Sequence, residues 1–66
     1  MKGTSKLTQL KAQRGTMSIG DLAKKAGLSD WTIRQVEAGG NIQNHDAAKL
    51  AAALGVSLAT LGQVEL

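Results

Sequence analysis

The sequence predicts a single small domain of the all-α class, and three observations support that class. The chain has 66 residues, with no cysteine, proline, phenylalanine or tyrosine and one tryptophan. Because β-sandwiches and barrels are rich in aromatic and β-branched residues, this composition disfavours them. Alanine, leucine, lysine and glutamine, which favour helices, dominate between the eight glycines, and apolar residues recur at helical spacing. We therefore expect five short helices in one domain over residues 1–66, with residues 62–66 as a tail.

The first helix is expected over Ser5–Arg14, after a polar leader of residues 1–4 that is expected to be mobile. Leu7 and Leu10, three residues apart, give this helix an apolar face. Gly15 then ends it. A helix at this position would cover part of the apolar surface of the segments that follow.

Two further helices, Ile19–Ala26 and Asp30–Ala38, form a central pair that meets at a tight turn at Gly27. Ser18, with an aspartate three residues on, is a helix-start signal, and Ser29 starts the second helix in the same way. The apolar residues expected to face inward are Leu22, Ala23, Ala26, Leu28, Ile33 and Val36. Helices this short are not stable alone in water, so the rest of the chain must cover these faces.

The C-terminal third is expected to supply the remaining cover. A loop at Ile42–His45 leads to a helix over His45–Leu54, with Asn44 as its cap. Apolar residues recur in it at helical spacing, namely Ala47, Leu50, Ala51 and Leu54. Ser57 can cap a fifth helix at Leu58–Leu61.

Several classes of function are disfavoured by what the sequence lacks. Without cysteine there is no disulfide framework and no thiolate metal site, and one histidine cannot make a zinc site. His45 has no accompanying nucleophile and base, so no catalytic residue is expected. No apolar run reaches membrane length, and no secretory segment is recognisable. We expect a reduced, cytoplasmic, soluble non-enzyme with no metal, no cofactor, no small-molecule ligand and no membrane contact.

The charge gives mild support for a polyanionic partner, because the formal net charge is +3 and the isoelectric point is about 9.7. Lys2 and Lys6 make the N-terminal end basic, either as a solvated tail or as an arm that touches phosphates. Two lysines are too few to define an arm, so the tail is favoured.

The second helix of the central pair presents an outward face that suits base recognition. Its members are Asp30, Trp31, Arg34, Gln35 and Ala38, with Thr32 at the side. Glutamine can bond adenine, arginine can bond guanine or phosphate, and aspartate can accept from cytosine. A helix fits the major groove of DNA, where its N-terminal residues reach deepest, and helix N-termini can hold phosphates.

These residues resemble the helix-turn-helix of the phage lambda/434 repressor and Cro class, the XRE family. In that motif, counted from Ile19, the fifth residue is small, the ninth is glycine, and the fourth, eighth, tenth, fifteenth and eighteenth are apolar. These positions are occupied by Ala23, Gly27, Leu22, Ala26, Leu28, Ile33 and Val36. The flanking segments also resemble the family, so the resemblance covers about residues 7–61.

The resemblance implies a compact five-helix, lambda repressor-like domain that binds double-stranded DNA sequence-specifically. Ser29–Ala38 would lie in the major groove, and the chain would act as a small phage-like transcriptional regulator, as a repressor by occupancy. A weak homodimer on a two-fold DNA site would raise its affinity. The expected DNA-binding residues are Ser18, Ser29, Asp30, Trp31, Thr32, Arg34, Gln35 and Asn41.

The sequence departs from the family pattern at its contact positions. Ile19 stands where the family often has a glutamine that grips a phosphate. An arginine of the first helix often pairs with a recognition-helix glutamate, and here Lys11 or Arg14 must pair with Glu37. The segment 40–43 is uncharged and lacks the usual basic residues and proline. Fewer cations imply weaker binding and a shallower salt dependence.

Two side chains of the outward face have alternative interpretations. Trp31 can fold onto the edge of the core, contact thymine methyls or sugars, or anchor a protein interface. Arg34 can contact phosphate or form an ion pair with Asp30. The rival function is therefore a protein-interaction module on the same fold, such as an antitoxin-like chain that grips its partner with Trp31.

Overall fold

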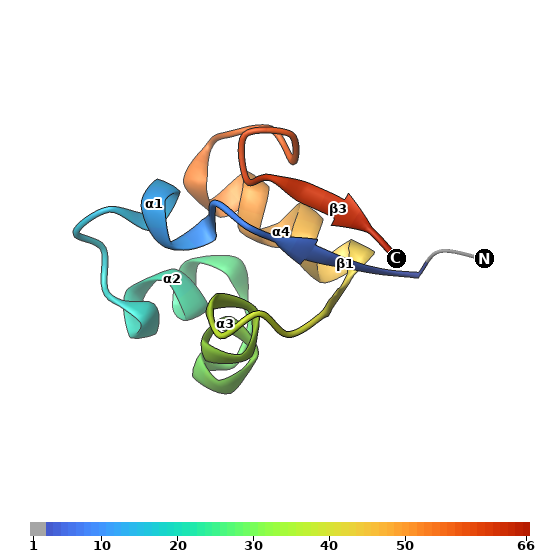
Figure 1. The fold of residues 1–66 in the computed structure, drawn as a ribbon. Helices are drawn as coiled ribbons and strands as arrows, with labels where there is room; N and C mark the ends of the chain where they lie inside the picture. Colours follow the sequence, from blue (N-terminus) through green and yellow to red (C-terminus); the bar gives the residue numbers. More distant parts are fainter. Residues whose placement is uncertain (1–2) are drawn as a thin grey trace.

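The computed structural model describes residues 3–66 and contains four helices and three short strands (Figure 1). In chain order the elements are β1 (Thr4–Leu7), α1 (Leu10–Arg14), α2 (Ile19–Ala26), α3 (Asp30–Glu37), β2 (Ile42–Gln43), α4 (Asn44–Leu54) and β3 (Gln63–Glu65). The central pair of helices is confirmed as α2 and α3. The all-α, five-helix expectation is wrong in two respects: the chain forms a sheet, and residues 58–61 are not a helix.

The strands form an antiparallel sheet in the order β2-β1-β3, which brings the two ends of the described chain together (Figure 1). Ser5 aligns with Ile42 on one side and with Glu65 on the other. The expected helix Ser5–Arg14 is therefore reduced to its C-terminal half, and Thr4 of the expected leader belongs to β1. Residues 63–65 of the expected tail form β3, whereas residues 1–2 of the leader lie outside the described residues.

A buried serine ties this sheet to α4. The Ser5 side chain is fully buried, donates to Asn44 Oδ1 and accepts from Gln63 Nε2 at 3.0 Å. Asn44 was expected to be a cap, but it is the first residue of α4, and Gln43 precedes it without a capping side-chain bond. The loop expected at Ile42–His45 is accordingly wrong, because pairing with β1 orders its first two residues as β2.

Residues 57–62 form hydrogen-bonded turns where the fifth helix was expected. The Ser57 hydroxyl accepts from the backbone N–H of Thr60 at 3.2 Å, as a helix cap would, but the segment that follows is a turn and the expected fifth helix is absent. The Leu61 N–H lies 3.1 Å from the Leu58 carbonyl, and Leu61 is fully buried. Gly62, with a φ of 71°, then turns the chain into β3 before a second helical turn can form.

The core lies between the sheet, α4 and the inward faces of α1, α2 and α3. Its buried apolar residues are Leu7, Leu10, Leu22, Ala23, Ile33, Val36, Ile42, Ala47, Leu50, Ala51, Ala53 and Leu61. Four of the six expected inward positions of the central pair belong to this group. Ala26 and Leu28, the other two, are partly buried against it, so the inward assignment is confirmed.

An ion pair joins α1 to the C-terminal end of α3. Arg14 donates from Nε to Glu37 Oε2 at 2.8 Å and from Nη2 to Oε1 at 3.0 Å, and its Nη1 donates to the Met17 carbonyl at 2.7 Å. The two side chains are only 14% and 11% exposed. The hydrogen bonds to Glu37 raise the pKa of Arg14 above its ordinary value, with burial opposing them and the carboxylate charge adding to them. Of the two candidate partners of Glu37, Arg14 is therefore the one observed.

We expect Glu37→Gln to lower the free energy of unfolding by about 1–3 kcal/mol, because the amide leaves a mostly buried guanidinium without its charged partner. Urea denaturation followed by circular dichroism measures the change. Glu65→Gln is the matched control, since Glu65 is exposed on β3, and it should change stability by less than about 0.5 kcal/mol. Equal effects of the two substitutions would contradict a structural role for the pair.

We expect Gly62→Ala to destabilise the fold more than Gly27→Ala, although the two glycines have nearly the same φ, 71° and 72°. Both substitutions incur the cost of a left-handed backbone, about 1–2 kcal/mol. A Cβ at Gly62 would also lie 2.2 Å from Thr8 Oγ1, whereas one at Gly27 meets nothing within 4 Å. The difference in urea midpoint, converted to free energy, should be at least about 1 kcal/mol, and no difference would contradict the close approach at Gly62.

Candidate nucleic-acid interface

The turn between α2 and α3 is built from local hydrogen bonds that the sequence signals predicted. The Ser18 hydroxyl accepts from the backbone N–H of Asp21 at 3.0 Å, and the Ser29 hydroxyl accepts from that of Thr32 at 3.2 Å. Gly27 adopts the left-handed conformation between the two helices. Both helix starts are therefore fixed by their own side chains, and the first turn of α3 has a defined orientation on the body of the domain.

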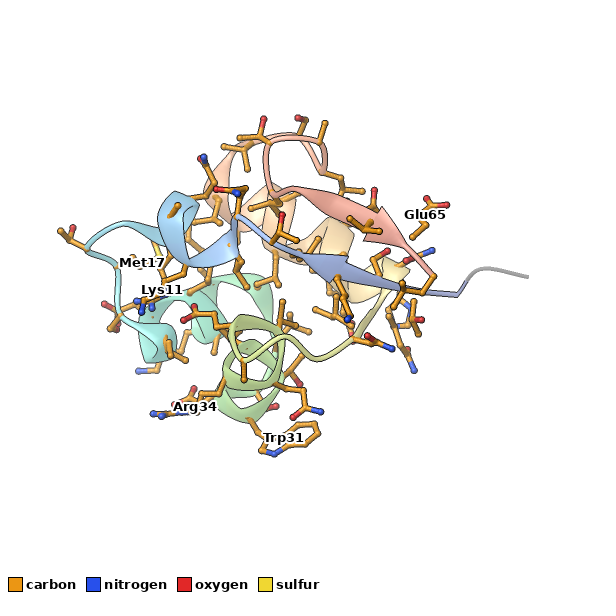
Figure 2. The ribbon with its side chains drawn as sticks, viewed as in Figure 1. Lys11, Met17, Trp31, Arg34 and Glu65 are labelled. Atoms are coloured by element: carbon orange, nitrogen blue, oxygen red, sulfur yellow. The ribbon has the colours of Figure 1, made fainter. Side chains whose placement is uncertain are left out.

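Trp31 stands in that first turn and is 68% exposed. Figure 2 shows Trp31 and Arg34 projecting from α3 away from the body of the molecule, on the side opposite to Glu65 of β3. The interpretation in which the ring folds onto the edge of the core is therefore wrong. An aromatic side chain this exposed is available to a partner.

Arg34 and Asp30 do not form the helical ion pair that their spacing allowed. Within residues 3–66, no ion pair joins them. A Cβ built on Gly20 would lie 3.9 Å from Asp30 Oδ2, so the Asp30 carboxylate lies beside the first turn of α2. There it is near the positive end of that helix dipole. The Arg34 guanidinium is exposed and has no hydrogen bond to another described residue.

Gln35 is exposed on α3, and its position depends on Gly40. The Gln35 carbonyl accepts from the Gly40 N–H at 2.8 Å. A Cβ at Gly40 would approach both that carbonyl oxygen and the Gln35 Cγ to 2.7 Å. The glycine therefore leaves the space in which the Gln35 side chain lies, with its amide free of bonds to other described residues.

The remaining expected site residues are those that take part in a helix cap, and Asn41, which takes part in none. The hydroxyls of Ser29 and Thr32 lie 2.9 Å apart and share a hydrogen bond, so both are already engaged at the start of α3. The Ser18 hydroxyl is likewise engaged by its cap. Asn41 is exposed in the segment between α3 and β2. The structure thus gathers six of the eight expected residues on α3 and its cap, between positions 29 and 35; five of them are exposed and Thr32 is half-buried.

Ile19 occupies the position at the start of α2 where the family often has a glutamine that binds a phosphate. The Ile19 side chain is partly buried and packs against the core, so it contributes to stability and has no polar group to offer. Backbone N–H groups at this helix end can still face an anion. The carboxylates of Asp21, in the first turn, and Asp30, beside it, reduce that attraction.

Two lysines outside the helix-turn-helix, Lys6 and Lys11, line a hollow with residues at the end of α3. The sequence favoured a solvated tail for Lys6 over an arm that touches phosphates and offered Lys11 only as a partner for Glu37, so neither was an expected site residue. The hollow has a volume of about 280 Å³, and its lining residues are Lys6, Leu7, Thr8, Lys11, Val36, Glu37 and Gly39. Lys11 lies one helical turn before Arg14, the partner of Glu37, and both this spacing and the family resemblance placed it near α3. Lys6 could not have been placed without knowing that residues 4–7 form a strand.

Among residues 3–66, no group of three or more His, Asp or Glu side chains is placed to hold a metal ion. None of the helices in this range has the length and apolar character needed to cross a bilayer. The residues that the structure brings together are therefore those of the exposed α3 face and the hollow at its C-terminal end.

A family model for the Cro/C1-type helix-turn-helix matches residues 7–61, which is most of the chain. Comparison with curated proteins and with solved structures gives no match. The matched range contains the whole of α1, α2, α3 and α4, including the buried positions and caps described above. The chain therefore belongs to the XRE family of Cro/C1-type helix-turn-helix proteins, a family of DNA-binding transcription regulators.

Proposed function

We propose that this chain binds double-stranded DNA sequence-specifically, with α3 in the major groove, and acts as a small repressor by occupying its site. One observation carries the proposal. The outward side chains of α3 are exposed and have no hydrogen bonds to other described residues at Trp31, Arg34 and Gln35, whereas Ile33 and Val36 of the same helix are 0% and 3% exposed. The helix is held on one face and left available on the other.

The dimensions of α3 suit this role. An α-helix with its side chains is about 10–12 Å across, and the major groove is about 12 Å wide. The N-terminal residues of a recognition helix reach deepest, which places Trp31 against base edges or thymine methyls. Gln35, one turn on, would read a base such as adenine, and Arg34 would bond guanine or a phosphate.

A domain of this size gains affinity when two copies bind a two-fold site. We therefore include a weak homodimer on DNA in the proposal. Asn41 and the capping serines Ser18 and Ser29 would contact the phosphates beside the groove. Such contacts position the helix but do not read the base sequence.

The exposure of Trp31 also favours a second candidate function, a protein-interaction module on the same fold. A tryptophan with 68% of its surface exposed is the type of side chain that anchors protein interfaces. The free Arg34 guanidinium beside it would suit an acidic partner. DNA remains the better candidate, because a protein interface does not require a polar reader such as Gln35.

Because Trp31 is the only tryptophan, its fluorescence reports directly on α3. We expect a pool of random-sequence duplexes at low salt to change its emission, and added salt to reverse the change as counterions return to the phosphates. Fluorescence titration and gel retardation measure the binding.

The same pool selected through several rounds should yield a preferred sequence. Lack of any emission change with the pool, together with lack of retardation, would overturn the DNA proposal. A change in Trp31 emission that occurs only with a protein partner would then favour the second candidate function.

We expect Gln35→Ala to relax the preference at one base position of the selected site, at a cost of about 1–3 kcal/mol for that base. Gln13→Ala, an equivalent exchange at an exposed residue of α1, is the matched control and should leave the preference unchanged. Competition titrations with duplexes varied at single positions measure both. A loss that is equal for all sequences would make Gln35 a positioning residue instead of a reader.

A further inference from the structure

The hollow at the C-terminal end of α3 combines a buried floor with a charged rim. It has a volume of about 280 Å³ and lies between β1, α1 and the end of α3. Leu7 and Val36 are each 3% exposed and form part of its floor, and Thr8 and Gly39 contribute to its wall. Lys6 on β1 and Lys11 on α1 border it with exposed side chains.

The charges around the hollow leave a positive excess. Glu37 is the only carboxylate in the lining, and the Arg14 guanidinium already binds both of its oxygens. In the described part of the chain neither Lys6 nor Lys11 has an ion-pair partner. Two lysines without an ion-pair partner therefore border a hollow whose only lining carboxylate is already paired, and an anion placed there would meet a net attraction.

The position of the hollow relative to α3 indicates which anion it would meet. When the N-terminal residues of a recognition helix reach deepest into the groove, its C-terminal end emerges beside the groove wall. That wall is a sugar-phosphate backbone, with one charge per about 1.7 Å of duplex axis. Glu37 and Gly39 mark this end of α3 and also line the hollow.

We infer that the hollow bordered by Lys6 and Lys11 is a phosphate site, occupied in the complex by a backbone phosphate of the bound duplex. The inference rests on the proposed function. It accounts for two departures of the sequence, the uncharged segment 40–43 and the inward-facing Ile19, because cations from β1 and α1 replace those missing from the usual places. Lys6 and Lys11 are positioning residues here, since phosphate contacts carry no base information.

The salt dependence of DNA affinity tests the site. The slope of log K against log salt is negative, and each lost phosphate contact reduces its magnitude by about 0.9. We expect Lys6→Gln and Lys11→Gln each to reduce the magnitude of the slope by about that amount. Each should also weaken the binding of selected and scrambled duplexes by the same factor, about 5–10-fold at 0.1 M salt. Lys49→Gln is the matched control, because Lys49 is exposed on α4 outside the hollow, and it should leave the slope unchanged.

The outcomes separate this inference from the proposed function. If the unaltered chain binds duplexes and the two lysine variants behave like Lys49→Gln, the phosphate site is wrong and the proposed function stands. If no duplex binds, the proposed function fails, and a titration with inorganic phosphate followed by amide NMR decides the chemistry of the hollow. Saturable shifts at Thr8 and Gly39 that Lys11→Gln abolishes would support a site for free phosphate, and their absence would overturn the inference.

Discussion

The arrangement of the helices depends on the three hydrogen bonds of one guanidinium. Arg14 binds both carboxylate oxygens of Glu37 and the carbonyl of Met17, so it joins the end of α1, the segment before α2 and the end of α3. A five-residue helix and an eight-residue helix have no stability of their own. The Arg14–Glu37 pair holds the C-terminal end of α3, and the caps at Ser18 and Ser29 hold the N-terminal ends of α2 and α3. The exposed face of α3 keeps its orientation because both of its ends are held.

The buried half of the helix-turn-helix was predictable because its signals are local. A capping serine and a helical apolar period act within a few residues, and the structure confirms them in α2 and α3. The strands were not predictable for the opposite reason. Leu7 and Leu10 satisfy a helical spacing as well as a strand followed by a turn, and β1 is settled by pairing with residues 37 to 60 positions away. A local sequence pattern does not contain the identity of these distant pairing partners.

The candidate site was predictable in the same uneven way. The list of outward residues on α3 followed from helical periodicity, and the structure places them as expected. The contacts of each side chain did not follow from periodicity, because they depend on neighbouring residues from other parts of the chain. Asp30 lies by Gly20 of another helix instead of pairing with Arg34, and Gln35 lies in space left by Gly40. Lys6 reaches the end of α3 only because the strand that carries it crosses there.

The charge distribution constrains how such a domain can select a sequence. Non-specific affinity for DNA comes almost entirely from phosphate neutralisation, and discrimination comes from base contacts. This chain has carboxylates beside the start of α2 and no cation in residues 40–43, so its non-specific affinity should be low. In the proposed complex Trp31 and Gln35 would then supply a large share of the binding energy, and a mismatch at the bases that they contact would cost a correspondingly large fraction of it. In the proposed complex the lysines at the hollow therefore set the register of α3, and pairing of two domains on one site compensates for the modest affinity of each.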